Sequence, residues 1–165
     1  MAGKSEVAFT AGFTLGDFRG RTESLTGQFT ADPSDLRQGT TGVLLVTVRG
    51  LRTGVEGRDR DLYTALDAER FPEMRFTVEQ VEASFHSVTD KTDVLLTING
   101  RMLIRDIERP MTFLGRVRLR DDRLWARGEA RLRLSDFGIG PVRRLFLKVR
   151  DEVGVSFDLT LAPAD

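Results

Sequence analysis

Apolar and polar residues alternate along most of this chain, and this alternation constrains its fold more than any other feature. Val7, Phe9, Ala11 and Phe13 fall on one face of an extended segment, and the same period recurs downstream. Successive side chains of a β-strand point to opposite faces, so this period predicts strands with one apolar face. Eight such strands are predicted, near residues 7–13, 25–29, 44–48, 74–85, 96–104, 111–119, 124–134 and 153–161.

One segment departs from the alternation. Leu62, Ala65, Leu66 and Ala68 recur at roughly helical spacing, and Pro72 restricts the residue before it to extended geometry. The sequence therefore predicts a short helix between the third and fourth strands, laid against an apolar surface.

The sixth and seventh predicted strands allow a test of pairing. A tight turn at Asp121-Asp122 would pair Leu119 with Leu124, Val117 with Ala126, Gly115 with Gly128 and Phe113 with Ala130 on the inner face. Most of these pairs contain glycine or alanine, whose side chains are too small to fill the interior of a barrel. We therefore expect a lumen beside this part of the wall. On the outer face Arg118 is expected to stack on Trp125. In the fourth strand, a slip of parity predicts a β-bulge near Gln80.

Length and charge limit the class of protein. A chain of 165 residues can form one domain over residues 1–165 and bury a core without disulfides or metals. Its 25 basic and 25 acidic residues cancel, which disfavours nucleic acid as a partner, and we expect the arginines to pair with carboxylates on neighbouring strands.

No stretch approaches the roughly 20 apolar residues that span a bilayer, so no transmembrane segment is expected. The segment MAGKSEVAFT lacks the apolar centre of a signal peptide; we expect a cytoplasmic protein, or a periplasmic or secreted one if a signal peptide has been removed.

Candidate catalytic residues are few. The chain has no cysteine and a single histidine, His86, expected at a strand end. Two acidic pairs, Asp59 with Asp61 and Asp121 with Asp122, stand where turns favour aspartate for backbone hydrogen bonds. The kinase-like triplet Asp-Phe-Gly at 136–138 has no accompanying Gly-rich loop or strand lysine. We therefore expect a protein that is not an enzyme, with no catalytic residues and no metal site.

Phenylalanine dominates the aromatic residues of the chain. There are eleven phenylalanines against one tyrosine and one tryptophan, and phenylalanine offers apolar surface without a hydrogen-bonding group. Several of them fall on predicted inner faces. Two interpretations stay open: the rings fill the interior as packed core, or they line a lumen that holds one small ligand.

Five segments, taken in order, resemble one known family. They are FRGRTESLTGQF at 18–29, ERFPEMRF at 69–76, NGRMLIRDIERPMTF at 99–113, LSDFGIG at 134–140 and VRDEVGVSFDL at 149–159. Their order and spacing are similar to those of the YceI-like, polyisoprenoid-binding family, over about Val7 to Leu161. The resemblance implies a bacterial, all-β protein: an eight-stranded antiparallel lipocalin-like barrel with a short helix after the third strand.

The resemblance also implies a function and a site. The lumen would bind a long apolar lipid, a polyisoprenoid or fatty-acyl chain, for storage or transport, with no cofactor besides that lipid. The expected ligand-binding residues are Phe9, Phe13, Phe29, Leu66, Phe76, Ile98, Met102, Met111, Phe113, Ala130, Leu132, Phe137 and Phe157. The helix containing Leu62, Leu66 and Phe71 would cover one side or mouth of the barrel as a plug or lid. Gly12 and Asp61 stand where family members often have histidine, which changes the polar lip of the pocket.

The alternative is a ligand-free interaction or stress-related β-barrel with a filled core, and a homodimer is one option for assembly.

Overall fold

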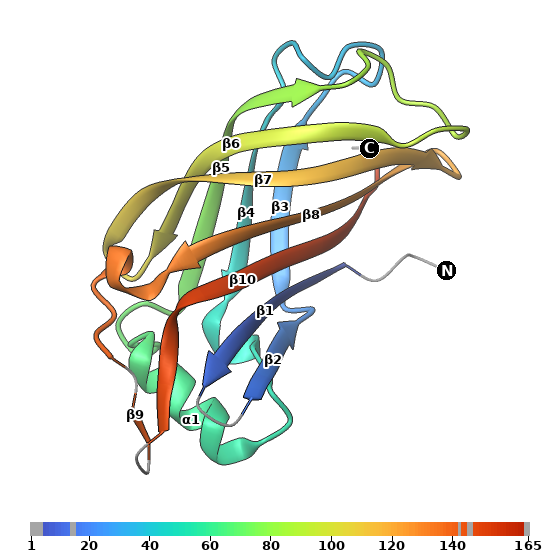
Figure 1. Ribbon diagram of the computed structural model, residues 1–165. Coiled ribbons are helices and arrows are strands. Elements are labelled where there is room, and N and C mark those ends of the chain that lie inside the picture. The colour runs from blue at the N-terminus through green and yellow to red at the C-terminus, as the bar shows by residue number, and fades with distance from the viewer. Residues whose placement is uncertain (1–4, 14–15, 142, 145–146, 164–165) are drawn as a thin grey trace.

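Ten strands, one α-helix and two short 3-10 helices make up the part of the chain that the computed structural model describes, residues 5–13, 16–141, 143–144 and 147–163 (Figure 1). The strands are β1 (Glu6–Phe13), β2 (Gly16–Thr22), β3 (Leu25–Thr30), β4 (Thr41–Thr47), β5 (Glu73–Ala83), β6 (Val94–Ile104), β7 (Ile107–Arg120), β8 (Arg123–Arg133), β9 (Arg143–Arg144) and β10 (Leu147–Leu161). The helix α1 spans Glu56–Ala65, and the 3-10 helices η1 and η2 span Val48–Gly50 and Leu134–Phe137. The prediction of an all-β protein with one short helix is confirmed.

The strands form one antiparallel sheet in the order β2-β1-β10-β8-β7-β6-β5-β4-β3, and β9 pairs with β10 beside this path. The sheet curls around an interior, and α1 lies across one end of it (Figure 1). Its two edges are β2 and β3, so the described sheet is a curled half-barrel. This architecture supports the lipocalin-like barrel implied by the family resemblance.

The predicted count of eight strands and the predicted position of the helix are both wrong. An additional strand, β2, follows β1, so α1 comes after the fourth strand instead of the third. The strand β2 gives no alternation because its one large apolar residue is Phe18, and Gly20 lies beneath the ring of Phe9. The strand β9 has only two residues and is too short for any pattern.

The predicted β-bulge and hairpin are confirmed. The register of the β5–β6 pair shifts between Val78 and Gln80. Asp121 and Asp122 join β7 to β8 with φ angles of 47° and 58°, as a type I′ turn requires. The β7–β8 ladder pairs Leu119 with Leu124, Val117 with Ala126 and Gly115 with Gly128 as predicted; it stops at Leu114 with Glu129, so the pair of Phe113 with Ala130 lies beyond it.

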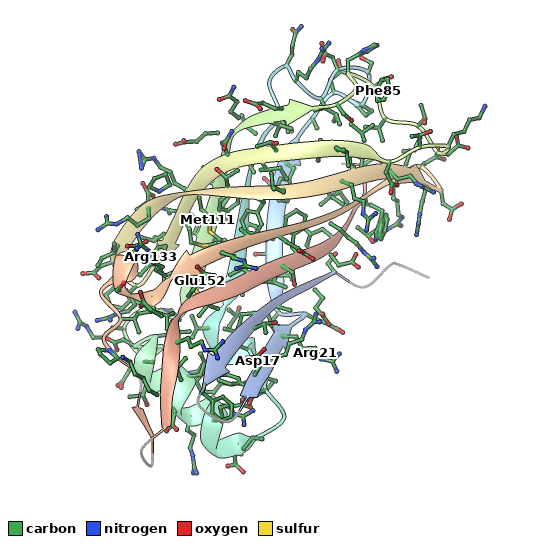
Figure 2. The ribbon with its side chains drawn as sticks, in the orientation of Figure 1. Asp17, Arg21, Phe85, Met111, Arg133 and Glu152 are labelled. Carbon is green, nitrogen blue, oxygen red and sulfur yellow. The ribbon has the colours of Figure 1, made fainter. Side chains whose placement is uncertain are left out.

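Charged side chains cover the outer face of the sheet, where neighbouring strands pair them (Figure 2). Arg131 Nη1 on β8 donates to Glu152 Oε1 on β10 at 2.8 Å, and Arg101 Nε on β6 donates to Glu79 Oε1 on β5 at 3.1 Å. The expectation that arginines pair with carboxylates of adjacent strands is confirmed for these residues.

The predicted stacking of Arg118 on Trp125 is wrong, although the two residues are opposite each other in the ladder. Arg118 Nε donates instead to Asp93 Oδ1 at 2.6 Å. The indole lies near two other guanidinium groups, those of Arg120 and Arg127, at 4.0 and 4.4 Å from its centroid. A carboxylate gives the Arg118 guanidinium a stronger partner than an aromatic ring does.

The helix α1 is held by packing and by one buried carboxylate. Asp59, 6% exposed, accepts hydrogen bonds from the backbone N of Thr53 at 2.8 Å and from its hydroxyl at 2.6 Å. Beyond the helix, Leu66 and Ala68 are buried in a cluster with Val48, Leu51, Ile104, Phe137 and Ile139. A helix this short depends on such contacts for its stability. No helix in the described part of the chain has the length and apolar content needed to cross a membrane.

Candidate functional site

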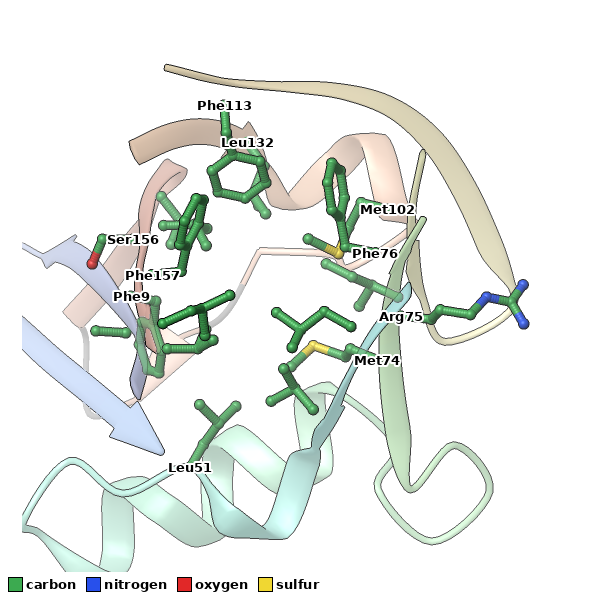
Figure 3. A pocket seen from close by; sticks show the side chains of 18 of the residues that line it. Phe9, Leu51, Met74, Arg75, Phe76, Met102, Phe113, Leu132, Ser156 and Phe157 are labelled. Carbon is green, nitrogen blue, oxygen red and sulfur yellow. The ribbon is translucent and has the colours of Figure 1, made fainter. Parts of the chain in front are cut away.

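The inner face of the sheet and α1 line a cavity of about 490 Å³ (Figure 3). Of the 42 lining residues in the described part of the chain, five are polar: Thr40, Arg58, Asp61, Arg75 and Ser156. The rest are alanine, valine, leucine, isoleucine, methionine and phenylalanine. The volume falls within the range of roughly 300–1,000 Å³ that is usual for small-molecule sites.

Three phenylalanines of the lining lie across glycines of the neighbouring strand. In the antiparallel ladders Phe9 is opposite Gly20, Phe29 is opposite Gly42 and Phe157 is opposite Gly128. A Cβ atom on any of these glycines would collide with the facing ring; at Gly128 it would lie 2.5 Å from Cε1 of Phe157. The rings therefore lie along the wall instead of crossing the interior. This arrangement lets an interior rich in phenylalanine keep a lumen.

The wall of small residues is built differently from the prediction. Ala126 lines the cavity, but Gly128 and Ala130 are not among the lining residues. The ring of Phe157 covers Gly128, and Ala130 packs against the buried cluster that contains Phe113. The space left by the glycine is thus taken by an aromatic ring from the next strand.

Three aromatic rings form the middle of the wall. The ring centroids of Phe76 and Phe113 are 5.0 Å apart, and those of Phe113 and Phe157 are 5.3 Å apart, both in edge-to-face arrangements. Figure 3 shows these three rings together on one side of the cavity. Edge-to-face pairs add to the stability of a core beyond the area they bury, so this part of the wall is well defined.

The polar groups of Thr40, Arg75 and Ser156 are hydrogen-bonded to the protein or directed away from the cavity, so the interior stays apolar near them. Thr40 Oγ1 donates to the carbonyl oxygen of Leu36 at 2.7 Å. The side chain of Arg75 extends away from the cavity, and its Nη2 lies 3.8 Å from Glu108 Oε2 (Figure 3). The hydroxyl of Ser156 also points away from the interior (Figure 3).

The other two polar residues, Arg58 and Asp61, are both on α1. Arg58 is half-buried, and its guanidinium carbon lies 4.6 Å from the ring centroid of Phe18 and 6.0 Å from that of Phe13. Both rings belong to the β1–β2 hairpin and line the cavity. Asp61 is exposed. Arg58 therefore reaches the lining where α1 meets the β1–β2 hairpin.

The helix covers one end of the cavity with apolar side chains. Leu62, Ala65 and Leu66 line the cavity. Leu51, from the segment before the helix, lines it as well, and Figure 3 shows its side chain between the helical ribbon and the cavity. Phe71, which the sequence places on the lid, does not line the cavity; its ring lies 5.2 Å from the guanidinium carbon of Arg70. The covering surface is thus α1 and its immediate C-terminal residue.

Ten of the thirteen residues expected to contact a ligand line the cavity: Phe9, Phe13, Phe29, Leu66, Phe76, Ile98, Met102, Phe113, Leu132 and Phe157. The other three, Met111, Ala130 and Phe137, do not. Met111 is buried in the cluster of Phe76 and Phe113, and Phe137, 2% exposed, packs beside Ile139. These three residues therefore have no surface in the cavity that a ligand could contact.

The sequence reasoning missed Phe18 and Arg58. Phe18 stands alone among polar residues of an edge strand, so no periodicity reveals it. Arg58 precedes Leu62 and Leu66 at intervals of four residues, which places the three on one helix face. This spacing is visible in the sequence, but a basic residue four positions before a leucine is usually interpreted as exposed to solvent at the edge of the apolar face.

Three of the four acidic residues considered for catalysis occupy structural positions, whereas Asp61 lines the cavity. Asp59 accepts two hydrogen bonds from Thr53, and Asp121 and Asp122 form the β7–β8 turn. His86 is exposed. Within residues 5–13, 16–141, 143–144 and 147–163, no three His, Asp or Glu side chains are grouped so as to hold a metal ion.

Comparison with known proteins gives a family and a fold. The model of the YceI-like domain matches residues 2–161. No curated protein matches the chain. Among solved structures, BcnA of Burkholderia cenocepacia superimposes with a TM-score of 0.82 at 17% identity, over 96% of this chain and 97% of that one. A polyisoprenoid binding domain from Saccharophagus degradans, implicated in plant cell wall breakdown, gives 0.73 at 14% identity over 96% and 94%. The YCEI protein of Campylobacter jejuni gives 0.72 at 13% identity over 88% and 85%.

Proposed function

Because the chain belongs to the YceI-like domain family, we propose that it binds a long apolar lipid, a polyisoprenoid or a fatty-acyl chain, in the cavity and stores or transports it. The observation that carries this proposal is the cavity, about 490 Å³ in volume, whose 42 described lining residues include five polar ones. A polar ligand would lose its hydrogen bonds to water on entering such an interior, whereas a hydrocarbon chain would not.

Burial of the chain supplies the affinity. Each methylene removed from water contributes about 0.8 kcal/mol. About two or three isoprene units would therefore reach micromolar affinity after the cost of association is subtracted. No specific polar contact is needed for binding of this strength.

The alternative is a ligand-free β-barrel with a packed interior. The stacking of Phe9, Phe29 and Phe157 over glycines favours the carrier, because it keeps large side chains out of the interior. A filled core would need rings that cross the lumen. The similarity to a polyisoprenoid binding domain adds support for an isoprenoid as the ligand.

We propose binding without catalysis. Asp61 is the one carboxylate among the described lining residues, and it is exposed. General acid–base catalysis usually needs an acid and a base positioned at the substrate, and the described lining holds one carboxylate and no histidine.

The test is uptake of geranylgeraniol by delipidated protein, followed by native mass spectrometry. Val155 lines the cavity on β10, so Val155→Trp should fill part of the lumen and abolish most of the uptake. The matched control is Leu114→Trp, because Leu114 is 66% exposed on the outer face of β7. Uptake that is equal in the two variants, or absent in the unmodified protein, would contradict the proposal.

A further inference from the structure

Arg58 and Arg75 both line the cavity, but their side chains are placed differently. Arg58 and Arg75 are the two basic residues among the described lining residues. Arg75 is exposed and lies beside Glu108, directed away from the interior (Figure 3). Arg58 is half-buried and rests against two rings that also line the cavity, those of Phe18 and Phe13.

The guanidinium of Arg58 lies within cation–π distance of the rings of Phe18 and Phe13. This attraction needs none of its five N–H donors as hydrogen bonds to an acceptor, so the group can also bind an anion. The planar fork matches the oxygens of a carboxylate or a phosphate, and such charge-assisted hydrogen bonds are about twice as strong as neutral ones. Partial burial between α1 and the hairpin reduces competition from water.

We propose that the bound lipid carries an anionic head group, a carboxylate or a phosphate, and that Arg58 binds this group where α1 meets the β1–β2 hairpin. The inference rests on the proposed function, since it concerns the polar end of the same ligand. The chain of the lipid then lies along the phenylalanine wall, away from α1. Arg58 sets the preference for the head group, and the apolar lining supplies the rest of the affinity.

Asp61 is the neighbouring carboxylate and acts in the opposite sense. It is exposed and stands three residues after Arg58 on the same helix, so its negative charge weakens the binding of an anion nearby. Asp61→Asn should therefore strengthen binding of the anionic lipids and leave a neutral lipid unaffected.

The experiment uses three probes with one C20 chain: geranylgeranyl phosphate, geranylgeranoic acid and geranylgeraniol. Dissociation constants are measured on the delipidated full chain and on Arg58→Met, Arg58→Lys and Arg60→Met. Arg60 is the matched control, because it is on the same helix, exposed, and absent from the cavity lining. Binding of geranylgeraniol shows in each variant whether the cavity is intact.

We expect at least one of the two anions to bind about tenfold or more tightly than the alcohol, which corresponds to one charge-assisted hydrogen-bonded contact. Arg58→Met should remove this preference without weakening the alcohol, Arg58→Lys should keep part of it, and Arg60→Met should keep all of it. Comparison of phosphate with carboxylate identifies which anion is preferred.

Equal affinity for all three probes in the unmodified protein would overturn the inference, as would a preference that survives Arg58→Met. In both cases binding of geranylgeraniol would leave the proposed function standing. If none of the three probes binds the unmodified protein, the proposed function and this inference are both overturned. A loss of all three affinities in Arg58→Met alone would show a structural role for Arg58, and would also overturn its assignment to the head group.

Discussion

The ring of Phe157 on β10 occupies the volume that any side chain on Gly128 of β8 would need. The two residues are directly opposite in the ladder, and a Cβ atom at position 128 would lie 2.5 Å from Phe157 Cε1. The glycine thus provides a flat stretch of backbone on which the ring rests. This contact keeps the ring out of the lumen.

Gly128→Ala should destabilise the protein and shift the ring towards the cavity. An added methyl group in a packed contact typically costs about 1–3 kcal/mol in the free energy of unfolding, measured by urea denaturation. The control is Gly154→Ala, since the nearest atoms to a Cβ there are 3.9 and 4.0 Å away. Equal losses of stability in the two variants would show that the contact between Phe157 and Gly128 has no special role.

Leu66→Asp should detach α1 from the end of the cavity. Leu66 is 7% exposed and lines the cavity, and an unpaired carboxylate buried there would cost several kcal/mol. Release of the helix is the less costly outcome because a short helix without packing is unstable. We expect an unchanged β signal by circular dichroism, faster proteolysis within residues 56–70 and faster lipid exchange. Arg60→Asp, at an exposed position, is the control; if both variants resist protease as the unmodified protein does, α1 is not a lid.

Asp59→Ala should destabilise the first turn of α1. The carboxylate accepts two hydrogen bonds from Thr53 while 6% exposed, so its removal leaves a backbone N–H and a hydroxyl without their acceptor. Loss of one partner in a buried hydrogen bond costs about 1–3 kcal/mol. Asp59→Asn keeps an oxygen that can accept a hydrogen bond. This variant should therefore recover part of the stability lost in Asp59→Ala, as measured by thermal unfolding. A smaller effect for alanine than for asparagine would argue against these hydrogen bonds.

Ser135→Ala should change the titration of Asp151. The hydroxyl of Ser135 donates to Asp151 Oδ2 at 2.6 Å and its backbone N–H donates to Oδ1 at 2.9 Å; these bonds, the hydroxyl first, hold the pKa of Asp151 below its usual value of 3.8. A carboxyl with a lowered pKa in the folded state stabilises that state above its unfolded pKa, and this contribution is lost as the pH falls through the folded value. The variant should raise the pKa, as followed by carboxyl NMR, and reduce the dependence of stability on pH below 3.8. An unchanged pKa in the variant would mean that other groups lower it.

Local patterns were sufficient to predict most strands and the orientation of their side chains. Alternation, the parity slip near Gln80 and the Asp121-Asp122 turn each depend on a few consecutive residues, and the structure confirms the latter two features directly. The same parity placed nine of the expected ligand-binding residues on the cavity wall, and Leu66 of the helical segment is the tenth. Local periodicity failed at β2, because an edge strand has little core to cover.

The lumen and its polar end depended on contacts between distant segments. Alternation places Phe157 on the inner face, but the glycine beneath it belongs to another strand, and this pairing decides whether the ring fills the lumen or lies along the wall. Arg58 likewise reaches the cavity because the curled sheet brings Phe18 next to α1. A periodic pattern specifies the direction of a side chain, whereas the group that it meets depends on how the whole sheet curls.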